Sequence, residues 1–171
     1  MPTVVLVNPK FPHNVGAALR ACSCWGADSL LYTGHRVSME ASEGYRLPRE
    51  ERMKGYKTVD FKQVERPWDL LPKGVVPIAI EVSPNAEVLS EFVHPENAAY
   101  FFGPEDGGLG RMELGLCHRF VIIPTAHCLN LAAAVNIVLY DRLLKGIQQG
   151  KIAAPSPETV LSESRGFIAN S

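Results

Sequence analysis

The chain has 171 residues, of which 46% are hydrophobic and 20% are charged. This composition is typical of a globular protein and excludes a largely disordered, collagen-like or coiled-coil chain. The 17 basic residues nearly balance the 18 acidic ones, and the formal net charge is -1 at pH 7. The charge therefore excludes a broadly basic nucleic-acid-binding protein, and we expect any polyanion to be bound by a local arrangement of charges.

Other global features indicate a cytoplasmic protein. No stretch reaches the roughly 18 consecutive apolar residues that a membrane span requires. The first seven residues have neither a basic flank nor a cleavage-like site, so we expect a strand there rather than a signal peptide. The four cysteines lack the spacing of a disulfide framework, and the five histidines lack metal-ligand spacing. We therefore expect reduced thiols and no metal site.

The hydrophobic pattern along the chain alternates between strands and helices. Short apolar runs predict buried strands at 4–7, 29–32, 75–82, 97–102 and 120–123. Small and apolar residues at helical spacing predict helices over 14–25 and from about 129 to 147. This alternation indicates an α/β fold with a mostly parallel sheet flanked by helices. We expect one domain over residues 1–150 and a peripheral or flexible tail over 151–171.

Residues 35–66 form a polar, charge-dense segment with eight basic and six acidic residues, a local balance of +2. A mixed-sign segment of this kind is either a solvated face, with a short helix around 49–54, or an RNA-contacting surface. Its candidate RNA-binding residues are Arg46, Arg49 and Arg52.

Ligands of open parallel sheets bind at the carboxyl ends of the strands, which here are followed by the loops 8–14, 80–84, 103–110 and 124–130. Asn14 stands at an expected helix start, where capping is its default role. Arg20 follows among small apolar residues, where a cation needs a carboxylate or an anionic ligand. The glycine-rich turn around Glu105 matches neither the dinucleotide fingerprint nor the P-loop. Asn130 stands at a helix entrance, and we interpret Cys128 nearby as a small hydrophobe rather than a nucleophile.

In combination these residues form three ordered motifs. They are Asn8-x5-Asn14-x-Gly16-x3-Arg20, then Phe102-Gly103-x-Glu105-x2-Gly108-Leu109, and then Ile123-Pro124 leading to Leu129-Asn130. The set resembles the motifs of the SPOUT superfamily and, more narrowly, of the SpoU (TrmH-type) branch of RNA ribose 2′-O-methyltransferases. The resemblance covers residues 4–145, and the length is similar to that of the small tRNA wobble-position methyltransferases.

The resemblance implies a trefoil knot formed by residues 103–140, an exception to the rule against knotted chains. It also implies a homodimer with the active site at the subunit interface and S-adenosylmethionine as the cofactor. The implied cofactor-binding residues are Ile80, Gly103, Ile123, Cys128 and Leu129.

The catalytic residues that the resemblance implies are Arg20, Asn14, Glu105 and Asn130. Arg20 would help deprotonate or orient the ribose 2′-hydroxyl, Asn14 and Glu105 would position Arg20 and the RNA, and Asn130 would shape the site. A guanidinium is not neutral at pH 7, so stabilising the developing alkoxide or holding a phosphate is a less demanding role for Arg20 than acting as the base.

Three positions depart from the family pattern: Cys128 and Ala132 replace serines, and Asp141 replaces a glutamate. The leading hypothesis is an S-adenosylmethionine-dependent RNA 2′-O-methyltransferase, with tRNA favoured over rRNA because no separate RNA-binding domain is present. The alternatives are an rRNA 2′-O-methyltransferase and a non-catalytic RNA-binding or assembly protein that retains the fold, which the residues at 128 and 132 motivate. A nucleotide-dependent oxidoreductase is disfavoured because no dinucleotide fingerprint follows the first strand.

Overall fold

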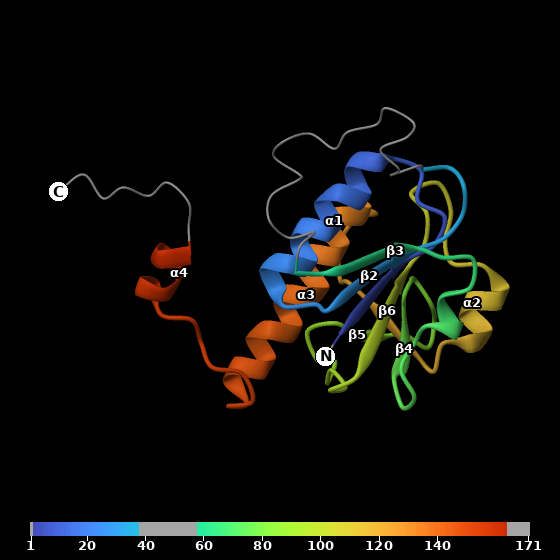
Figure 1. Ribbon diagram of the computed structural model, residues 1–171. Coiled ribbons are helices and arrows are strands. Elements are labelled where there is room, and N and C mark those ends of the chain that lie inside the picture. The colour runs from blue at the N-terminus through green and yellow to red at the C-terminus, as the bar shows by residue number, and fades with distance from the viewer. Residues whose placement is uncertain (1, 38–57, 164–171) are drawn as a thin grey trace, which may run out of the picture.

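The computed structural model describes residues 2–37 and 58–163, and in this part of the chain seven short strands form one sheet (Figure 1). The strands are β1 (Thr3–Leu6), β2 (Ser29–Tyr32), β3 (Asp60–Gln63), β4 (Val76–Ile80), β5 (Glu87–Val88), β6 (Ala98–Phe102) and β7 (Arg119–Ile122). Their spatial order is β3-β2-β1-β6-β4-β7-β5, and all six pairings are parallel. The predicted α/β fold with a parallel sheet is confirmed.

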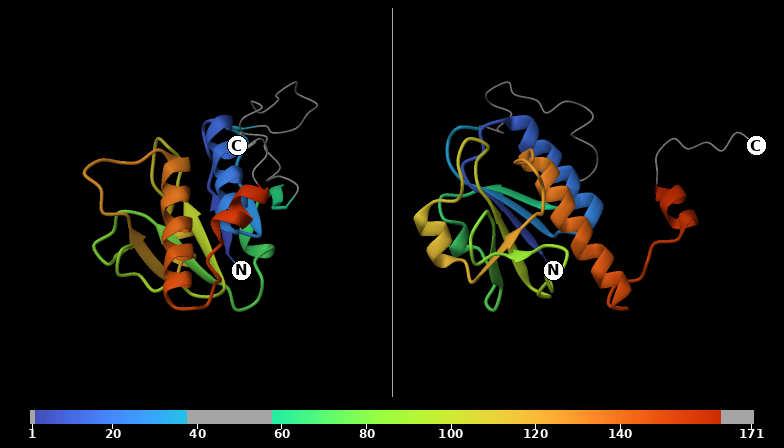
Figure 2. Two further views of the ribbon diagram at one scale, coloured as in Figure 1. Left: turned by 90° about the vertical axis from the view of Figure 1, so that its left-hand side faces the viewer. Right: turned by 180° about the vertical axis from the view of Figure 1, so that it is seen from behind.

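Helices cover both faces of this sheet. They are α1 (Pro12–Trp25), α2 (Arg111–Leu116), α3 (Leu131–Gln148) and α4 (Pro157–Glu163), with one 3-10 turn, η3 (Pro67–Asp69). Helices α1 and α3 lie side by side on one face, and the shorter α2 lies on the other (Figures 1 and 2). Helix α4, within the segment expected to be a peripheral tail, stands apart from the sheet in Figure 1.

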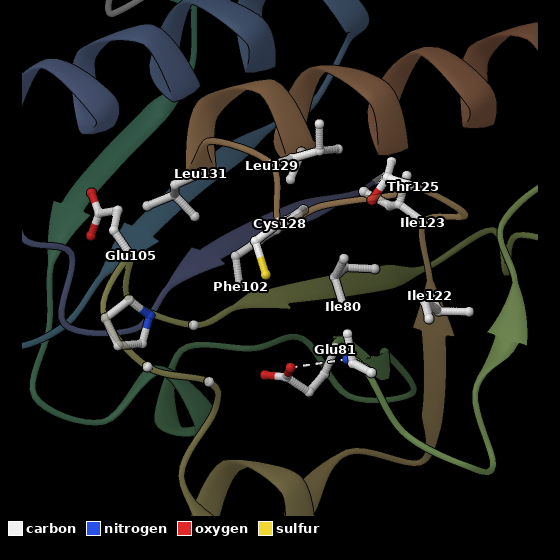
Figure 3. A pocket seen from close by; sticks show the side chains of 16 residues that line it. Ile80, Glu81, Phe102, Glu105, Ile122, Ile123, Thr125, Cys128, Leu129 and Leu131 are labelled. Atoms are coloured by element: carbon white, nitrogen blue, oxygen red, sulfur yellow. Dashed lines mark hydrogen bonds between the residues drawn. The ribbon is translucent and has the colours of Figure 1, made fainter.

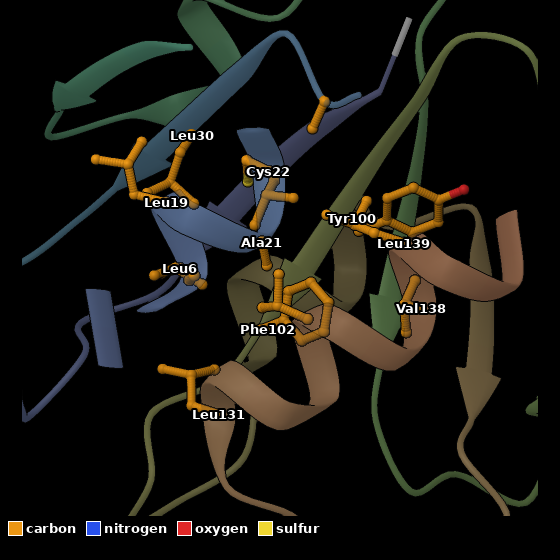
Figure 4. Packing of buried hydrophobic residues seen from close by; sticks show 14 of the residues in the cluster. Leu6, Leu19, Ala21, Cys22, Leu30, Tyr100, Phe102, Leu131, Val138 and Leu139 are labelled. Carbon is orange, nitrogen blue, oxygen red and sulfur yellow. The ribbon is translucent and has the colours of Figure 1, made fainter. Parts of the chain in front are cut away.

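Two hydrophobic clusters hold these layers together. Alternate residues of a strand point to opposite faces, so Leu6, Tyr100 and Phe102 pack under α1 and α3, as Figure 4 shows for that cluster. Val5 and Phe101 point the other way, toward η3 and α2. Burial on both faces explains why these strands are apolar throughout and were visible in the sequence.

The structure corrects the sequence prediction where the chain is polar. All five predicted strands and both predicted helices are present, with shifts of one or two residues at most ends. Strand β3 was missed because it is a sheet edge made of Asp60-Phe61-Lys62-Gln63, with only Phe61 partly buried, and the expectation there was a solvated face or an RNA-contacting surface. Strand β5, α2 and α4 are short elements that were also missed. The helix expected around 49–54, with Arg46, Arg49 and Arg52, lies outside the described residues.

The register brings the functional loops to one edge of the sheet. Leu6 pairs with Phe102, Phe102 pairs with Ile80, and Ile80 pairs with Val121. The carboxyl ends of β1, β6, β4 and β7 are therefore level, and the loops that follow these strands meet there.

Candidate functional site

A pocket of about 340 Å³ opens at this carboxyl edge, where β4, β6 and β7 end (Figure 3). Its volume lies within the range of small-molecule sites, about 300 to 1,000 Å³. The five residues with an implied role in cofactor binding, Ile80, Gly103, Ile123, Cys128 and Leu129, all line its wall. The wall is largely apolar, and the polar side chains of Glu81, Glu105 and Thr125 also line it.

Close backbone contacts fix the glycine-rich loop on this wall. A Cβ atom on Gly103 would lie 2.8 Å from the carbonyl carbon of Gly108 and from the nitrogen of Leu109, so no larger residue fits there without moving backbone. A Cβ atom on Gly108 would lie 2.6 Å from Oε2 of Glu81. The glycines therefore let the loop fold back on itself beside the pocket.

Glu81 fastens this loop to the end of β4. Its Oε2 accepts a hydrogen bond of 2.8 Å from the backbone nitrogen of Leu109, and its Oε1 accepts one of 2.9 Å from that of Val82. Each oxygen keeps a lone pair for a further donor, and the residue lines the pocket. Glu81 was not among the predicted site residues, although it lies in the predicted loop 80–84 and a charged residue directly after a buried strand at a ligand-binding edge is a usable signal.

Asn130 begins α3 at the rim of the pocket. It is the N-cap residue, and its Oδ1 accepts hydrogen bonds from the backbone nitrogens of Ala132 at 2.9 Å and Ala133 at 3.2 Å. These bonds satisfy two of the unpaired N–H groups at the helix start. The predicted helix entrance is therefore in place, and it fixes the orientation of the Asn130 amide.

From Asn130 a chain of hydrogen bonds crosses the site. Nδ2 of Asn130 donates to Oδ1 of Asn14 at 2.9 Å, and Nδ2 of Asn14 donates to Oε1 of Glu105 at 2.6 Å. Oε2 of Glu105 in turn accepts from the backbone nitrogen of Lys10 at 2.7 Å. Three of the four residues with implied catalytic roles are thus joined, although they lie up to 116 positions apart in sequence.

The chain of hydrogen bonds keeps Glu105 ionised. Partial burial alone would raise the pKa of this carboxyl, but the hydrogen bonds from the Asn14 side chain and from the backbone N–H groups of Lys10 and Phe11 lower it below its ordinary value. A fixed carboxylate at the pocket rim can orient a cation or a hydroxyl group.

The predicted capping role of Asn14 is wrong. Helix α1 begins at Pro12, with Phe11 as the N-cap, so Asn14 lies inside the first turn and is 3% exposed. Its amide serves Glu105 and Asn130 instead of the helix end. A capping preference acts over three residues, whereas these partners come from distant loops.

Arg20 lies on α1 but not in the pocket of its own chain. It follows Asn14 by six residues, which corresponds to about 9 Å along the helix axis and about 120° around it. Asn14 is buried, whereas Arg20 is exposed and does not line the pocket. The structure therefore brings together Asn14, Glu105 and Asn130 but leaves Arg20 on the outer surface of the same helix.

An exposed ion cluster borders the pocket. Nη1 and Nη2 of Arg36 donate to the two oxygens of Asp106 at 2.9 and 2.7 Å, and Nζ of Lys10 lies 3.4 Å from Asp106 Oδ2. The hydrogen bonds from Arg36, with a contribution from Lys10, lower the pKa of Asp106 to about 2. This cluster was not predicted from the sequence, because its members come from the loops after β1, β2 and β6.

A second polar network lies on the carboxyl-terminal half of α3. Nδ1 of His94 lies 2.6 Å from the hydroxyl of Tyr100, and Nε2 lies 2.8 Å from Oδ2 of Asp141. Lys145 pairs with Asp141 at 2.7 Å and donates to two backbone carbonyls, while Arg142 donates to two more. A cavity of about 490 Å³ adjoins this network. Asp141, one of the departures from the family pattern, thus has His94 and Lys145 as partners.

Over residues 2–37 and 58–163, the structure contains no group of three or more His, Cys, Asp or Glu side chains that could hold a metal ion. Within the same ranges, no helix has the length and hydropathy needed to cross a membrane.

Comparison with protein families gives one match that covers most of the chain. Residues 1–140 match the model of the SpoU rRNA Methylase family. The matched region contains the pocket, the hydrogen-bond chain and Arg20.

Individual proteins show the same similarity. The chain is 28% identical over 166 residues to tRNA (cytidine-2′-O-)-methyltransferase TrmJ of Methanocaldococcus jannaschii, covering 86% of this chain and 70% of that protein. A structure solved to study 2-OH methylation of C/U34 on tRNA is 25% identical, with a TM-score of 0.69 over 85% of this chain and 97% of the other.

The SpoU methyltransferase AviRb of Streptomyces viridochromogenes shares the fold. It is 21% identical, with a TM-score of 0.74 over 87% of this chain. The present chain spans only 61% of AviRb. AviRb has also been solved in complex with the cofactor AdoMet, and that structure matches with a TM-score of 0.72.

Proposed function

Because the chain belongs to the SpoU rRNA methylase family, we propose that it is an S-adenosylmethionine-dependent methyltransferase acting on a ribose 2′-hydroxyl of tRNA. The family match over residues 1–140 is the observation that carries this proposal. tRNA is favoured as the substrate because both the TrmJ relative and the C/U34 structure are named for tRNA methylation.

The pocket fits S-adenosylmethionine in chemistry and size. Gly103 and Gly108 let the loop fold tightly beside the pocket, while Ile80, Ile123 and Leu129 supply an apolar surface for an adenine ring. We propose that these residues and Cys128 hold the cofactor. When bound, it supplies an activated methyl group on a sulfonium centre.

The protein residues then have to align a hydroxyl group and manage one proton. Methyl transfer to an alcohol is an in-line displacement, so positioning supplies much of the acceleration. We assign Glu105, held by Asn14 and Asn130, to orienting the reacting groups, and Arg20 to stabilising the developing alkoxide or holding the neighbouring phosphate.

A homodimer would reconcile the exposed position of Arg20 with this role. A second copy packed against α1 can place its Arg20 at the pocket that the first copy leaves open. Ile137, Tyr140 and Leu144 support this arrangement, because they are 38%, 48% and 37% exposed and follow one another at helical spacing along α3. We therefore propose that this apolar stripe forms the interface.

We also propose a trefoil knot and an RNA-contacting segment for this chain. β7 follows β4 and β5 in sequence but lies between them in the sheet, which supports a trefoil knot over residues 103–140. The segment with Arg46, Arg49 and Arg52 is proposed to contact RNA near the shared site.

The test is methylation of total tRNA by the purified protein with isotope-labelled S-adenosylmethionine, followed by nucleoside mass spectrometry. The proposal predicts a labelled 2′-O-methylnucleoside and its loss, by at least about a hundredfold, in Arg20→Ala. A lysine at position 20 keeps the charge but not the fork of donors and is expected to restore little activity. Absence of any labelled nucleoside with tRNA or rRNA would contradict the proposal, and full activity of Arg20→Ala would contradict the role of Arg20.

A further inference from the structure

Phe11 and His13 form an exposed pair of aromatic rings next to the site. Their ring centroids are 5.4 Å apart and their planes differ by 20°, the geometry of an offset stack. Phe11 is 41% exposed, and His13 is also exposed. An aromatic pair that contributes to stability alone is normally buried, as are Trp68 and Phe101 in large part, whereas this pair presents its ring surfaces to solvent.

The backbone of Phe11 is joined to the first turn of α1, next to the hydrogen-bond chain. The carbonyl oxygen of Phe11 accepts from the backbone nitrogen of Asn14 at 3.1 Å and from that of Val15 at 3.4 Å, at the first turn of α1. The backbone nitrogen of the preceding Lys10 donates to Glu105 at 2.7 Å. The backbone that carries the two rings is therefore held beside Glu105 at the pocket rim.

The charges around the rings are balanced. Nζ of Lys10 lies 5.4 Å from the centroid of the Phe11 ring and also pairs with Asp106, which Arg36 engages through both of its oxygens. Two cations thus face the carboxylates of Asp106 and Glu105. A ligand drawn to this surface would gain its affinity mainly from the flat ring faces rather than from excess charge.

From these observations we propose that Phe11 and His13 form a stacking platform for an unpaired nucleobase of the RNA substrate. This inference rests on the proposed function, because it assigns a surface for the RNA nucleotide at the same site. RNA-binding proteins stack splayed-out bases on exposed Phe, Tyr, Trp and His rings. The platform would hold the target nucleotide or its neighbour while Glu105 lies next to its ribose.

Substitutions at position 11 separate stacking from simple apolar contact. Phe11→Leu keeps an apolar side chain of similar size without a ring, whereas Phe11→Tyr keeps the ring. Binding of tRNA to the protein without cofactor can be measured by fluorescence anisotropy, with unlabelled tRNA as the competitor. We expect the Kd for tRNA to rise about tenfold in the leucine variant and to stay within about twofold in the tyrosine variant. The change should be similar at low and high salt, since stacking releases no counterions. Leu70→Ala, an exposed apolar position 53% accessible on the opposite face, is the control and should bind like the wild type.

A tryptophan at position 11 reports stacking directly. The Phe11→Trp variant has a third tryptophan, whose fluorescence adds to that of the two native ones. Bound tRNA should quench this additional fluorescence, and the wild type measures how much the two native tryptophans are quenched. Wild-type affinity in the leucine variant, or an unquenched signal at saturating tRNA, would overturn the platform. If the wild type methylates no RNA, the proposed function fails, whereas methylation with an unchanged Kd in the leucine variant contradicts the platform alone.

Discussion

Helix α3 carries a polar network at each end, and the two differ in whether they reach the pocket at the carboxyl edge of the sheet. At its start, Asn130 leads through Asn14 to Glu105 beside an open pocket. Toward its end, Asp141 and Lys145 join His94 to the loop before β6. The first network ends on the backbone N–H of Lys10 in the loop after β1, and the second ends on the carbonyl oxygens of Leu89 and Phe92.

Cavity size does not distinguish these two regions. The cavity beside the second network is the larger, at about 490 Å³ compared with about 340 Å³. However, both ring nitrogens of His94 have partners, and Lys145 uses its three donors on Asp141 and two carbonyl oxygens. The second network is thus fully paired within the chain and stabilises the fold, whereas Glu105 of the first network lines the pocket at the carboxyl edge, where ligands of parallel sheets bind. We therefore assign function to the first network and stability to the second.

The largest expected effect is that of Gly103→Ala on cofactor binding. The added Cβ would lie 2.8 Å from backbone atoms of Gly108 and Leu109, so the loop must move into or away from the pocket. We expect S-adenosylmethionine affinity, measured by calorimetry, to fall about a hundredfold or more. Gly107→Ala is the matched control, since its Cβ would meet only Pro104 at 4.0 Å. Equal affinity in the two variants would contradict the assigned role of the loop.

The next effect is that of Glu105→Gln on methyl transfer. Both carboxylate oxygens accept hydrogen bonds, and a glutamine can keep only one of them. We expect kcat/KM for tRNA to fall by about tenfold to a hundredfold, the loss of one or two charge-assisted hydrogen bonds. Cofactor affinity should change less, and an unchanged kcat/KM would remove Glu105 from the mechanism.

The same variant has a predictable pH dependence. The pKa of Glu105 lies below its ordinary value of 4.5, so the ionised form stabilises the folded chain above that pH. This contribution is lost as the pH falls through the lower folded-state value. In urea titrations the stability difference between wild type and Glu105→Gln should therefore shrink below pH 4.5, and a difference that grows there would contradict the assigned ionisation.

In the second network, His94→Gln should lower the free energy of unfolding and leave cofactor binding unaltered. The His94 side chain is only 5% exposed, and removing a buried hydrogen-bonded group costs about 1–3 kcal/mol. Urea unfolding at pH 7.5 would measure the loss, and calorimetry would measure cofactor affinity. A large loss of cofactor affinity would mean that the two ends of α3 are not functionally separate.

The His94 network should also make stability depend on pH. Burial lowers the pKa of His94 below 6.5, and repulsion from Lys145 and Arg142 acts in the same direction. The hydrogen bond and the attraction to Asp141 raise this pKa, but burial outweighs them. The unfolded chain then binds more protons, so stability falls as the pH drops below about 6.5. His94→Gln should flatten this slope between pH 7 and pH 5, and an identical slope in the variant would contradict the assignment.

The sequence predicted those parts of the two regions whose structure depends on neighbouring residues, and it did not predict the contacts between distant residues. The strands around Val5, Ile78 and Phe101 were predictable because burial on both faces requires continuous apolar runs. The three motifs also identified the loops of the pocket. The local capping rule gave Asn14 the wrong role, since its partner Glu105 lies 91 residues away, and only the resemblance grouped the two residues in one site. The hydrogen bond between His94 and Asp141 was not predicted either, because the two residues are not part of any recognisable sequence motif.

The smallest expected effect concerns charge at the pocket rim. Asp106→Asn removes the carboxylate that Arg36 and Lys10 share and should raise tRNA affinity about two- to threefold at low salt, because the two cations become available to phosphates. The gain should disappear at high salt. Asp69→Asn, which removes an exposed partner of Arg66 on the opposite face, should show no gain, and an equal gain would indicate a general charge effect instead.

The central claim, that the pocket at the carboxyl edge is the cofactor site, is most directly tested by cysteine alkylation mapped by mass spectrometry. Cys128 is exposed on the pocket wall, Cys24 is exposed on α1 away from it, and burial raises the pKa of Cys22 and Cys117 to about 12. S-adenosylmethionine at about ten times its Kd should slow alkylation of Cys128 roughly tenfold and leave the rate at Cys24 unchanged. An unchanged rate at Cys128 under saturating cofactor would contradict the account.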